Sequence, residues 1–124
     1  MAAEQARYRD LKVWQRGMDL VEEVYRLTAA FPREERYGLT SQLRRAASAI
    51  PMNIAEGSCR STRRDYASFI SIAMGSAGEL ETGILIALRL RFVTTADATP
   101  LMDMVSHLSR MLRSLRTRLL IPNP

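Results

Sequence analysis

Four stretches of the chain carry apolar residues at the three- and four-residue spacing of an amphipathic helix. They predict helices over residues 10–30, 38–57, 62–91 and 99–119. The apolar stripe of the first comprises Leu11, Trp14, Met18, Val21, Tyr25 and Thr28. Phe31-Pro32 ends this helix, because the residue before a proline is disfavoured in helical conformation.

The second stretch contains a proline in its interior. Pro51 lacks the backbone N–H of a helical residue and crowds the preceding turn, so it predicts either one kinked helix or two helices. The apolar stripe continues in phase as far as Ile54. We therefore favour a single kinked helix, which ends at Gly57-Ser58.

The third stretch has small residues on the side opposite its apolar stripe, namely Ser71, Gly75, Gly78 and Thr82. Glycine in a helix interior costs about 0.5–1 kcal/mol relative to alanine, so its use here predicts the close approach of another backbone. That backbone could belong to the same chain or to a neighbouring one. Thr62 and Asp65 fit a capping box at the start of this helix, and Thr99-Pro100 fits the start of the fourth.

These four helices predict an all-α fold in a single domain over residues 1–124. Short connections favour an antiparallel up-and-down four-helix bundle with a kinked second helix. A bundle of 124 residues has limited internal burial, which makes a homo-oligomer a reasonable expectation.

Positive charge is concentrated in parts of the chain. The net charge is +5, and all but one of the 18 basic residues are arginines. Arginine suits planar contacts with phosphate and carboxylate, although genomic coding bias would give the same composition. No aromatic residues interleave with the arginines in the sequence, so we expect no base-stacking platform.

The motifs of the common enzyme classes do not occur in the sequence. His107 is the single histidine, no Glu-x-x-His pair is present, and Cys59 has no identifiable catalytic partner. We expect no enzyme activity, cofactor, metal or small-molecule substrate. The charge-poor third helix contains Glu79 and Glu81, which favours a buried helix over a membrane span. A cytoplasmic protein without a signal peptide is expected.

Polar residues of the second and third helices are interpreted as structural. Asn53 and Glu56 could satisfy backbone groups freed by Pro51 or lock helix pairs, and Glu79 lies on the neighbouring helix. An acid/base pair or a metal site is the less favoured alternative.

Several motifs resemble those of a known family. The segments 42–47 (QLRRAA), 50–57 (IPMNIAEG) and 69–82 (FISIAMGSAGELET) are similar to the signatures of proteins encoded in intervening sequences of 23S ribosomal RNA genes, also called the S23 ribosomal protein family. Residues 11–15 (LKVWQ) and 31–35 (FPREE) match its opening helix and first turn. The chain departs from the pattern at Ala49, where serine is common, and at residues 89–92 (RLRF), where a Leu-Gly pair is common.

The resemblance implies a four-helix bundle that assembles into a homopentameric ring. It also implies a distant relation to the accessory variability proteins of diversity-generating retroelements, which bind nucleic acid and a reverse transcriptase. Together with the clustered charge, it favours a non-enzymatic accessory protein that binds ribosomal RNA or another nucleic acid. The candidate contacts are Arg44, Arg45, Arg60, Arg63, Arg64, Arg110, Arg113 and Arg116. The alternative is a protein-interaction or scaffold module whose arginines serve only solubility.

Overall fold

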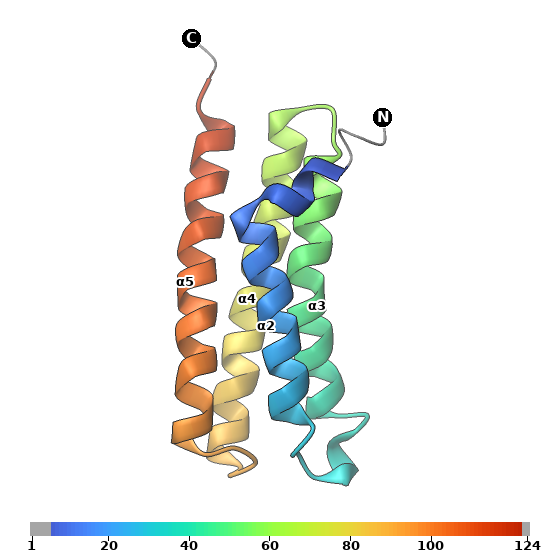
Figure 1. The fold of residues 1–124 in the computed structure, drawn as a ribbon, viewed down its shortest axis with the longest axis vertical. Helices are drawn as coiled ribbons and strands as arrows, with labels where there is room; N and C mark the ends of the chain where they lie inside the picture. The colour runs from blue at the N-terminus through green and yellow to red at the C-terminus, as the bar shows by residue number, and fades with distance from the viewer. Residues whose placement is uncertain (1–5, 123–124) are drawn as a thin grey trace.

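The computed structural model describes residues 6–122 and contains four long helices (Figure 1). A 3₁₀ helix, η1 (Ala6–Asp10), precedes the first of them, and a second, η2 (Arg33–Glu35), lies in the first connection. The long helices are α2 (Lys12–Thr28), α3 (Leu39–Ser58), α4 (Arg63–Arg89) and α5 (Thr95–Leu120). The all-helical prediction is confirmed for the described residues.

Successive helices run in opposite directions along the bundle (Figure 1). Each helix packs against two others, so that α2–α3, α3–α4, α4–α5 and α5–α2 form the four sides. The α3–α4 side has the most extensive contact and the α5–α2 side the least. One end of the bundle therefore gathers η1, the start of α2, the α3–α4 connection and the end of α5.

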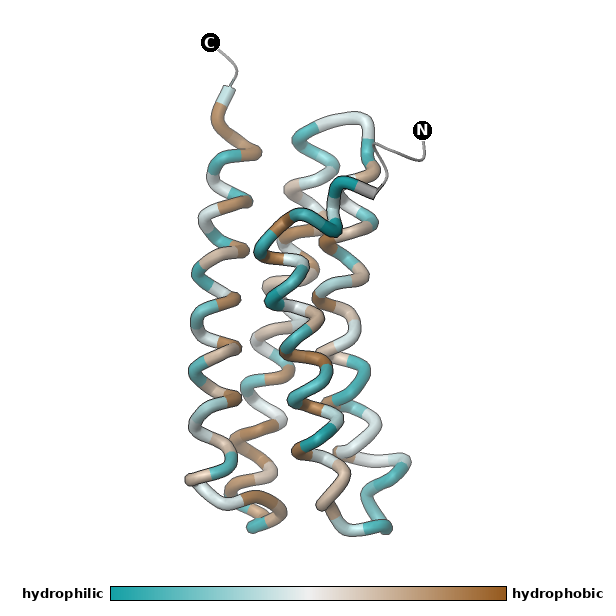
Figure 2. The backbone as a smooth tube through the Cα atoms, in the orientation of Figure 1, coloured by the Kyte–Doolittle hydropathy of each residue, from teal (hydrophilic) through white to brown (hydrophobic). Residues whose placement is uncertain are grey.

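The core follows the apolar stripes, and Figure 2 shows hydrophobic positions recurring along each helix. The expected stripe of α2 is wrong in its register, because Met18 and Tyr25 lie on the surface. The buried residues of this helix are Val13, Gly17, Leu20, Val24 and Thr28. Gly17 faces the ring of Pro51, and a Cβ at this glycine would lie at 3.4 Å from that ring, which is an ordinary van der Waals contact.

α3 is a single helix through Pro51, so the alternative of two separate helices is excluded. Pro51 is buried against α2, while Asn53 on the same helix donates from Nδ2 to the carbonyl of Ala49 at 2.8 Å. The carbonyl that the proline leaves without a helical donor is that of Ala47. The Asn53 side chain therefore bonds to the carbonyl of Ala49 and not to the carbonyl freed by Pro51. The kink of this helix stays a prediction.

α5 begins one turn before the expected start at Thr99-Pro100. Thr94 is the N-cap, and its hydroxyl accepts a hydrogen bond from the Asp97 backbone N–H at 3.1 Å. The Thr-x-x-Asp pattern is the same one that starts α4 at Thr62, where the N-cap prediction is confirmed. Pro100 consequently lies inside the first two turns of α5 rather than at its first position.

The end of α4 is followed by an arginine in left-handed conformation. Arg91 has φ of 62°, and its N–H bonds to the carbonyl of Leu88 at 3.1 Å. The N–H of Phe92 bonds to the carbonyl of Ala87 at 2.9 Å. These two bonds define a Schellman motif, which turns the chain toward α5 without a glycine.

α4 is long and apolar enough to cross a membrane by length and composition. Nine of its residues are buried inside the bundle. The close approach expected at its glycines occurs within the chain at Gly83, where an added Cβ would lie 2.2 Å from Leu43 Cδ2. At Gly75 and Gly78 an added Cβ would meet no atom within 4 Å.

Candidate nucleic-acid interface

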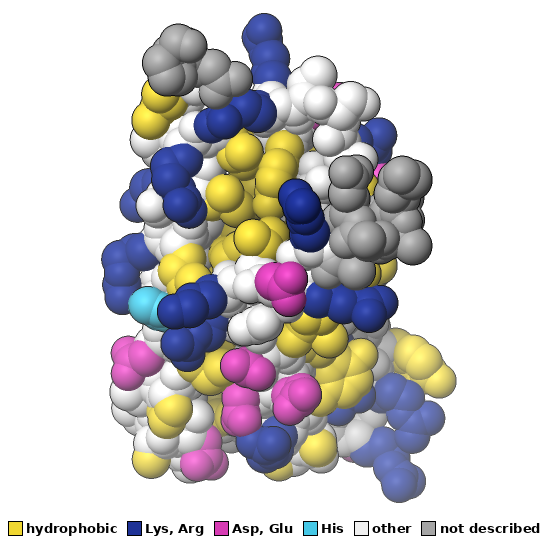
Figure 3. Space-filling model, turned by 45° about the horizontal axis from the view of Figure 1, so that its top comes forward, with side chains coloured by type: hydrophobic (Ala, Val, Ile, Leu, Met, Phe, Trp, Pro, Cys, Tyr) yellow, Lys and Arg dark blue, Asp and Glu magenta, His cyan; other side chains and the backbone are white. Residues whose placement is uncertain are grey.

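Basic residues are concentrated in one half of the bundle, which we call the basic end. It comprises residues 6–19, 49–76 and 108–122, with eleven Lys and Arg against four Asp and Glu, or a net charge of +7. The other half, residues 20–48 and 77–107, has seven basic and eight acidic residues, or a net charge of −1. In Figure 3, which brings the basic end forward, Lys and Arg side chains surround a hydrophobic area.

Arg64 and Arg113 are the most available of the predicted contacts. Arg64 lies in the first turn of α4 and Arg113 near the end of α5, and both are exposed. Within the described part of the chain, neither has an ion-pair partner. A bound phosphate would therefore displace water rather than an existing carboxylate.

Arg63 has a structural role at the same end. Its Nε donates to the carbonyl of Leu119 at 3.3 Å, and its Nη2 donates to the carbonyl of Arg118. The guanidinium thus satisfies carbonyls at the C-terminus of α5, where a positive charge is also favoured by the helix dipole. Arg63 fixes α4 against α5 and adds to the positive field from this position.

Two arginines of α5 are oriented by hydroxyl groups. Arg116 donates from Nε to Ser71 Oγ of α4 at 2.7 Å, and Arg110 donates from Nη1 to Ser106 Oγ at 2.9 Å. Both side chains are exposed, so part of each guanidinium remains open to a ligand.

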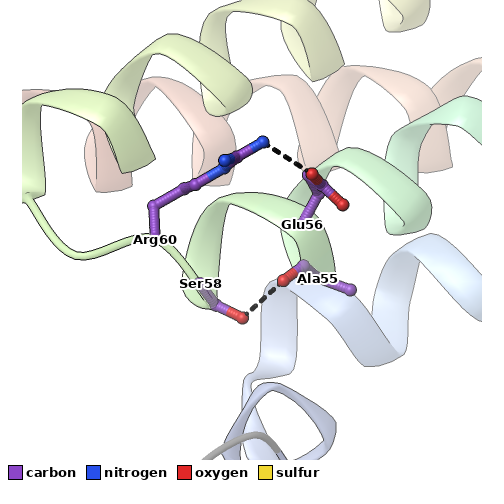
Figure 4. A network of polar contacts seen from close by, with 4 residues as sticks. All are labelled: Ala55, Glu56, Ser58 and Arg60. Carbon is purple, nitrogen blue, oxygen red and sulfur yellow. Dashed lines mark hydrogen bonds and ion pairs between the residues drawn. The ribbon is translucent and has the colours of Figure 1, made fainter.

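Arg60 is held by residues of α3 and α4. Its Nη2 lies 2.7 Å from Glu56 Oε1 (Figure 4). Its guanidinium carbon lies 4.6 Å from the centre of the Phe69 ring. Nearby, the Ser58 hydroxyl donates to the carbonyl of Ala55 at 2.8 Å and secures the last turn of α3 (Figure 4). Glu56 therefore orients Arg60. We had expected Glu56 to satisfy backbone groups near Pro51 or to lock helix pairs.

Arg44 and Arg45 do not join the other predicted contacts. They lie in the opposite half of the bundle, and the 13 residues from Arg45 to the end of α3 at Ser58 span about 20 Å. Arg44 packs over the ring of Tyr25 with its guanidinium carbon 4.4 Å from the centre. Arg44 over Tyr25 and Arg60 over Phe69 show that aromatic residues that do not interleave with the arginines in the sequence contact them in the fold. The expectation of no base-stacking platform stays a prediction.

The sequence analysis missed five basic residues of this end. They are Arg7 and Arg9 of η1, Lys12 and Arg16 of α2, and Arg118 of α5. The first four lie in a region, residues 1–31, whose net charge is zero as a whole. The signal in the sequence was that four of its five basic residues lie in its first half, whereas Glu22 and Glu23 lie in its second.

The residues expected to serve close packing lie on the outward side of α4. Ser71, Gly75, Gly78, Glu79 and Thr82 are all exposed. Thr82 Oγ1 donates to the carbonyl of Gly78 at 3.0 Å, so its hydroxyl is satisfied within the helix. Because an added Cβ at Gly75 or Gly78 would meet no atom within 4 Å, these glycines do not pack closely against the same chain. Packing against a neighbouring chain stays a prediction.

Tyr66 is the one described group at the basic end whose pKa is clearly displaced. Burial raises the pKa of its phenol above the ordinary value of 10.0. The positive charge of Arg118 acts in the opposite direction, and the Cys59 thiol adds a smaller increase to that pKa. Among the described residues, no group of three or more His, Cys, Asp or Glu side chains is placed to hold a metal ion.

Residues 9–114 match the profile of a protein family described as 23S rRNA-intervening sequence protein. The chain is also similar to a crystal structure from Bacteroides thetaiotaomicron, described as a protein with unknown function from the S23 ribosomal protein family. The two share 18% sequence identity with a TM-score of 0.76, over 84% of this chain and 97% of the other. No curated protein matches the chain. Because the profile covers most of its length, the chain belongs to the family of 23S rRNA-intervening sequence proteins.

Proposed function

We propose that the protein binds nucleic acid through the basic end and acts by binding rather than by catalysis. The observation that carries the proposal is the division of charge, +7 in one half of the bundle against −1 in the other. A solvated surface that served only solubility would not need its positive charge gathered at one end. The family's description refers to an intervening sequence of 23S rRNA and names no ligand, so ribosomal RNA is one candidate among the nucleic acids to be tested.

Contact with phosphates is the binding mode that suits this end. Arg64, Arg113 and Arg116 come from two neighbouring helices and are exposed. Their guanidinium groups can donate two hydrogen bonds to one phosphate. Such contacts do not depend on base sequence, and they release counterions, so the affinity should fall with salt.

We also propose that copies of the chain assemble through the outward side of α4. The open space over Gly75 and Gly78 would let a second backbone approach closely, and Ile72 and Ile86 expose apolar surface beside them. A ring of five is the assembly that the family resemblance implies. Such a cytoplasmic ring would repeat the basic end and multiply weak phosphate contacts.

The alternative is a scaffold whose partner is another protein. In that case the basic end would meet an acidic protein surface, and binding would survive nuclease treatment. We favour nucleic acid because the basic residues of this end come from η1, α2, α4 and α5, and a phosphate backbone offers the repeated negative charges that such a spread can contact.

Charge reversal at the basic end tests the proposed function. The double variant Arg64→Glu/Arg113→Glu should lower affinity for duplex DNA or RNA by roughly tenfold or more at low salt, because two phosphate contacts become repulsive. Fluorescence anisotropy with a labelled duplex measures the change.

The matched control is Arg33→Glu/Arg89→Glu, which changes net charge by the same amount in the other half of the bundle. It should retain most of the wild-type affinity. Equal losses in the two double variants would show that only net charge matters and would contradict a localised site.

A further inference from the structure

An open groove lies along the outer side of α3, and its lining extends from Arg36 and Tyr37 before α3 to Glu56 and Phe69 within the basic end. Its volume is about 1000 Å³, and side chains of α2, α3 and α4 line it. Three of its lining residues are aromatic, namely Tyr25 of α2, Tyr37 immediately before α3 and Phe69 of α4. The groove thus combines flat apolar surfaces from three separate segments of the chain.

One of these aromatic residues carries an arginine that is fixed in place. Arg44 packs on Tyr25 at 4.4 Å, and its Nε donates to Thr28 Oγ1 at 2.9 Å. Thr28 is itself buried and donates to the carbonyl of Val24 at 2.7 Å. Because both the ring and the hydroxyl hold the guanidinium, its free side forms an ordered planar surface in the groove.

The two other aromatic residues also lie beside arginines. The guanidinium carbon of Arg36 lies 5.8 Å from the centre of the Tyr37 ring, and that of Arg60 lies 4.6 Å from Phe69. Tyr37 is 88% exposed, so its ring is open to a ligand without any rearrangement of the core. Each aromatic lining residue is therefore paired with a cation.

The charges of the groove suit an anion that also carries polar edges. Arg36, Arg44 and Arg45 line it together with Glu56 and Glu79. Glu56 is already paired with Arg60, which leaves Glu79 as the unpaired carboxylate among these residues. Arginines can hold phosphates, while a carboxylate can accept hydrogen bonds from base amino groups.

We infer that the α3 groove binds unpaired nucleotides of RNA or DNA, with bases stacked on Tyr37 and on the Arg44–Tyr25 pair. The inference rests on the proposed function for its ligand, a nucleic acid, and adds that a single-stranded segment is recognised at a second place. Bases stack on aromatic rings and on guanidinium planes only when they are free of a duplex. Arg45 lines the same groove and is exposed, so it would contact the backbone phosphates.

Removal of the exposed ring is the direct test. Tyr37→Ala should weaken binding of labelled oligouridylate and oligothymidylate of about 12 nucleotides by roughly fivefold or more. Tyr37→Phe keeps the ring and should bind both as the wild type does. Affinity for a mixed-sequence duplex should change less than about twofold in either variant. A difference between the two oligonucleotides would distinguish RNA from DNA as the preferred strand.

Tyr25→Ala provides a second variant, since it removes the ring beneath Arg44 and should also weaken single-strand binding. Crosslinking of an oligonucleotide that contains 4-thiouridine should label the groove at Tyr25, Tyr37 or Met52, which is 68% exposed. Unchanged single-strand affinity in both alanine variants, or crosslinks confined to η1 and α5, would overturn the inference.

The failure of the inference and that of the proposed function give different results. If Tyr37→Ala and Tyr25→Ala leave single-strand affinity unchanged but Arg64→Glu/Arg113→Glu lowers duplex affinity, only the inference about the groove is refuted. If the wild-type protein binds neither single strands nor duplexes at low salt, both proposals are refuted.

Discussion

At the scale of single residues, the six glycines of the chain serve different purposes. Gly83 is buried, and an added Cβ would lie 2.2 Å from Cδ2 and 3.3 Å from Cγ of Leu43. Leu43 is itself only 2% exposed and has little room to move. Gly75 has no such neighbour, although both glycines lie in the interior of α4.

Alanine substitution should therefore have opposite effects at the two positions. We expect Gly83→Ala to lower the free energy of unfolding by about 1–3 kcal/mol, because the core must shift around the new methyl group. Gly75→Ala should raise it by about 0.5–1 kcal/mol, since alanine restricts the unfolded chain and favours the helix. Urea unfolding followed by circular dichroism measures both. A loss at Gly75 as large as that at Gly83 would contradict the packing described.

Tyr66 predicts how stability changes in alkaline solution. Because burial raises the pKa of its phenol, the folded chain keeps this proton to a higher pH than the unfolded chain, in which the pKa is near 10.0. The resulting stabilisation is present below about pH 10 and is lost as the pH rises from there through the pKa of the folded state.

Tyr66→Phe should reduce the fall in unfolding free energy between about pH 9 and pH 11. Tyr37→Phe removes a phenol from an exposed position and is the matched control. Denaturant unfolding at a series of pH values measures the slope. The same slope in wild type and Tyr66→Phe would show that this phenol does not contribute.

At the scale of elements, the turn after α4 carries strain that a glycine at the same position would avoid. Arg91 occupies the left-handed region with φ of 62°, which costs a residue with a Cβ about 1 kcal/mol. Arg91→Gly should therefore stabilise the protein by up to about 1 kcal/mol. Arg91→Ala removes the charge but retains the strain, so it should give no comparable gain. Thermal unfolding of the two variants distinguishes strain from charge.

The assembly proposal also belongs to one element, the outward side of α4. A leucine at Gly78 would enter open space within the chain, so it should leave the monomer folded. Gly78→Leu should nevertheless lower the mass measured by light scattering, because it fills the surface where a second copy would pack. Thr117→Leu, at an exposed position on α5, is the control. A wild-type mass for Gly78→Leu would contradict assembly through this surface.

At the scale of the whole molecule, periodicity was enough to predict the four helices and their caps to within a few residues. Periodicity did not predict features that depend on contacts between helices or on the choice between two caps. The buried side of α2 differs by one position from the predicted stripe, and α5 begins at Thr95 because Thr94 rather than Thr99 is its N-cap. The pairings of Arg44 with Tyr25 and of Arg60 with Phe69 join residues that are distant along the chain or in separate helices.

The candidate site was predictable in part for the same reason. Arginines that are neighbours in sequence, such as Arg63 and Arg64, were recognised as a cluster. The positive charge that η1 and α2 add to the basic end depends on which helix ends lie together in the fold. The net charge of residues 1–31 is zero, so a count over this range does not reveal it. Only the fold reveals that positive charge occupies one half of the bundle.

The measurement that tests the central claim most directly is the salt dependence of binding to labelled duplex DNA and RNA. We expect the logarithm of the association constant to fall linearly with the logarithm of salt concentration, with a slope of about −0.9 for each phosphate contacted. Arg64→Glu/Arg113→Glu should reduce the magnitude of that slope by about two. Binding that is insensitive to salt, or no binding at low salt, would contradict a phosphate-binding basic end.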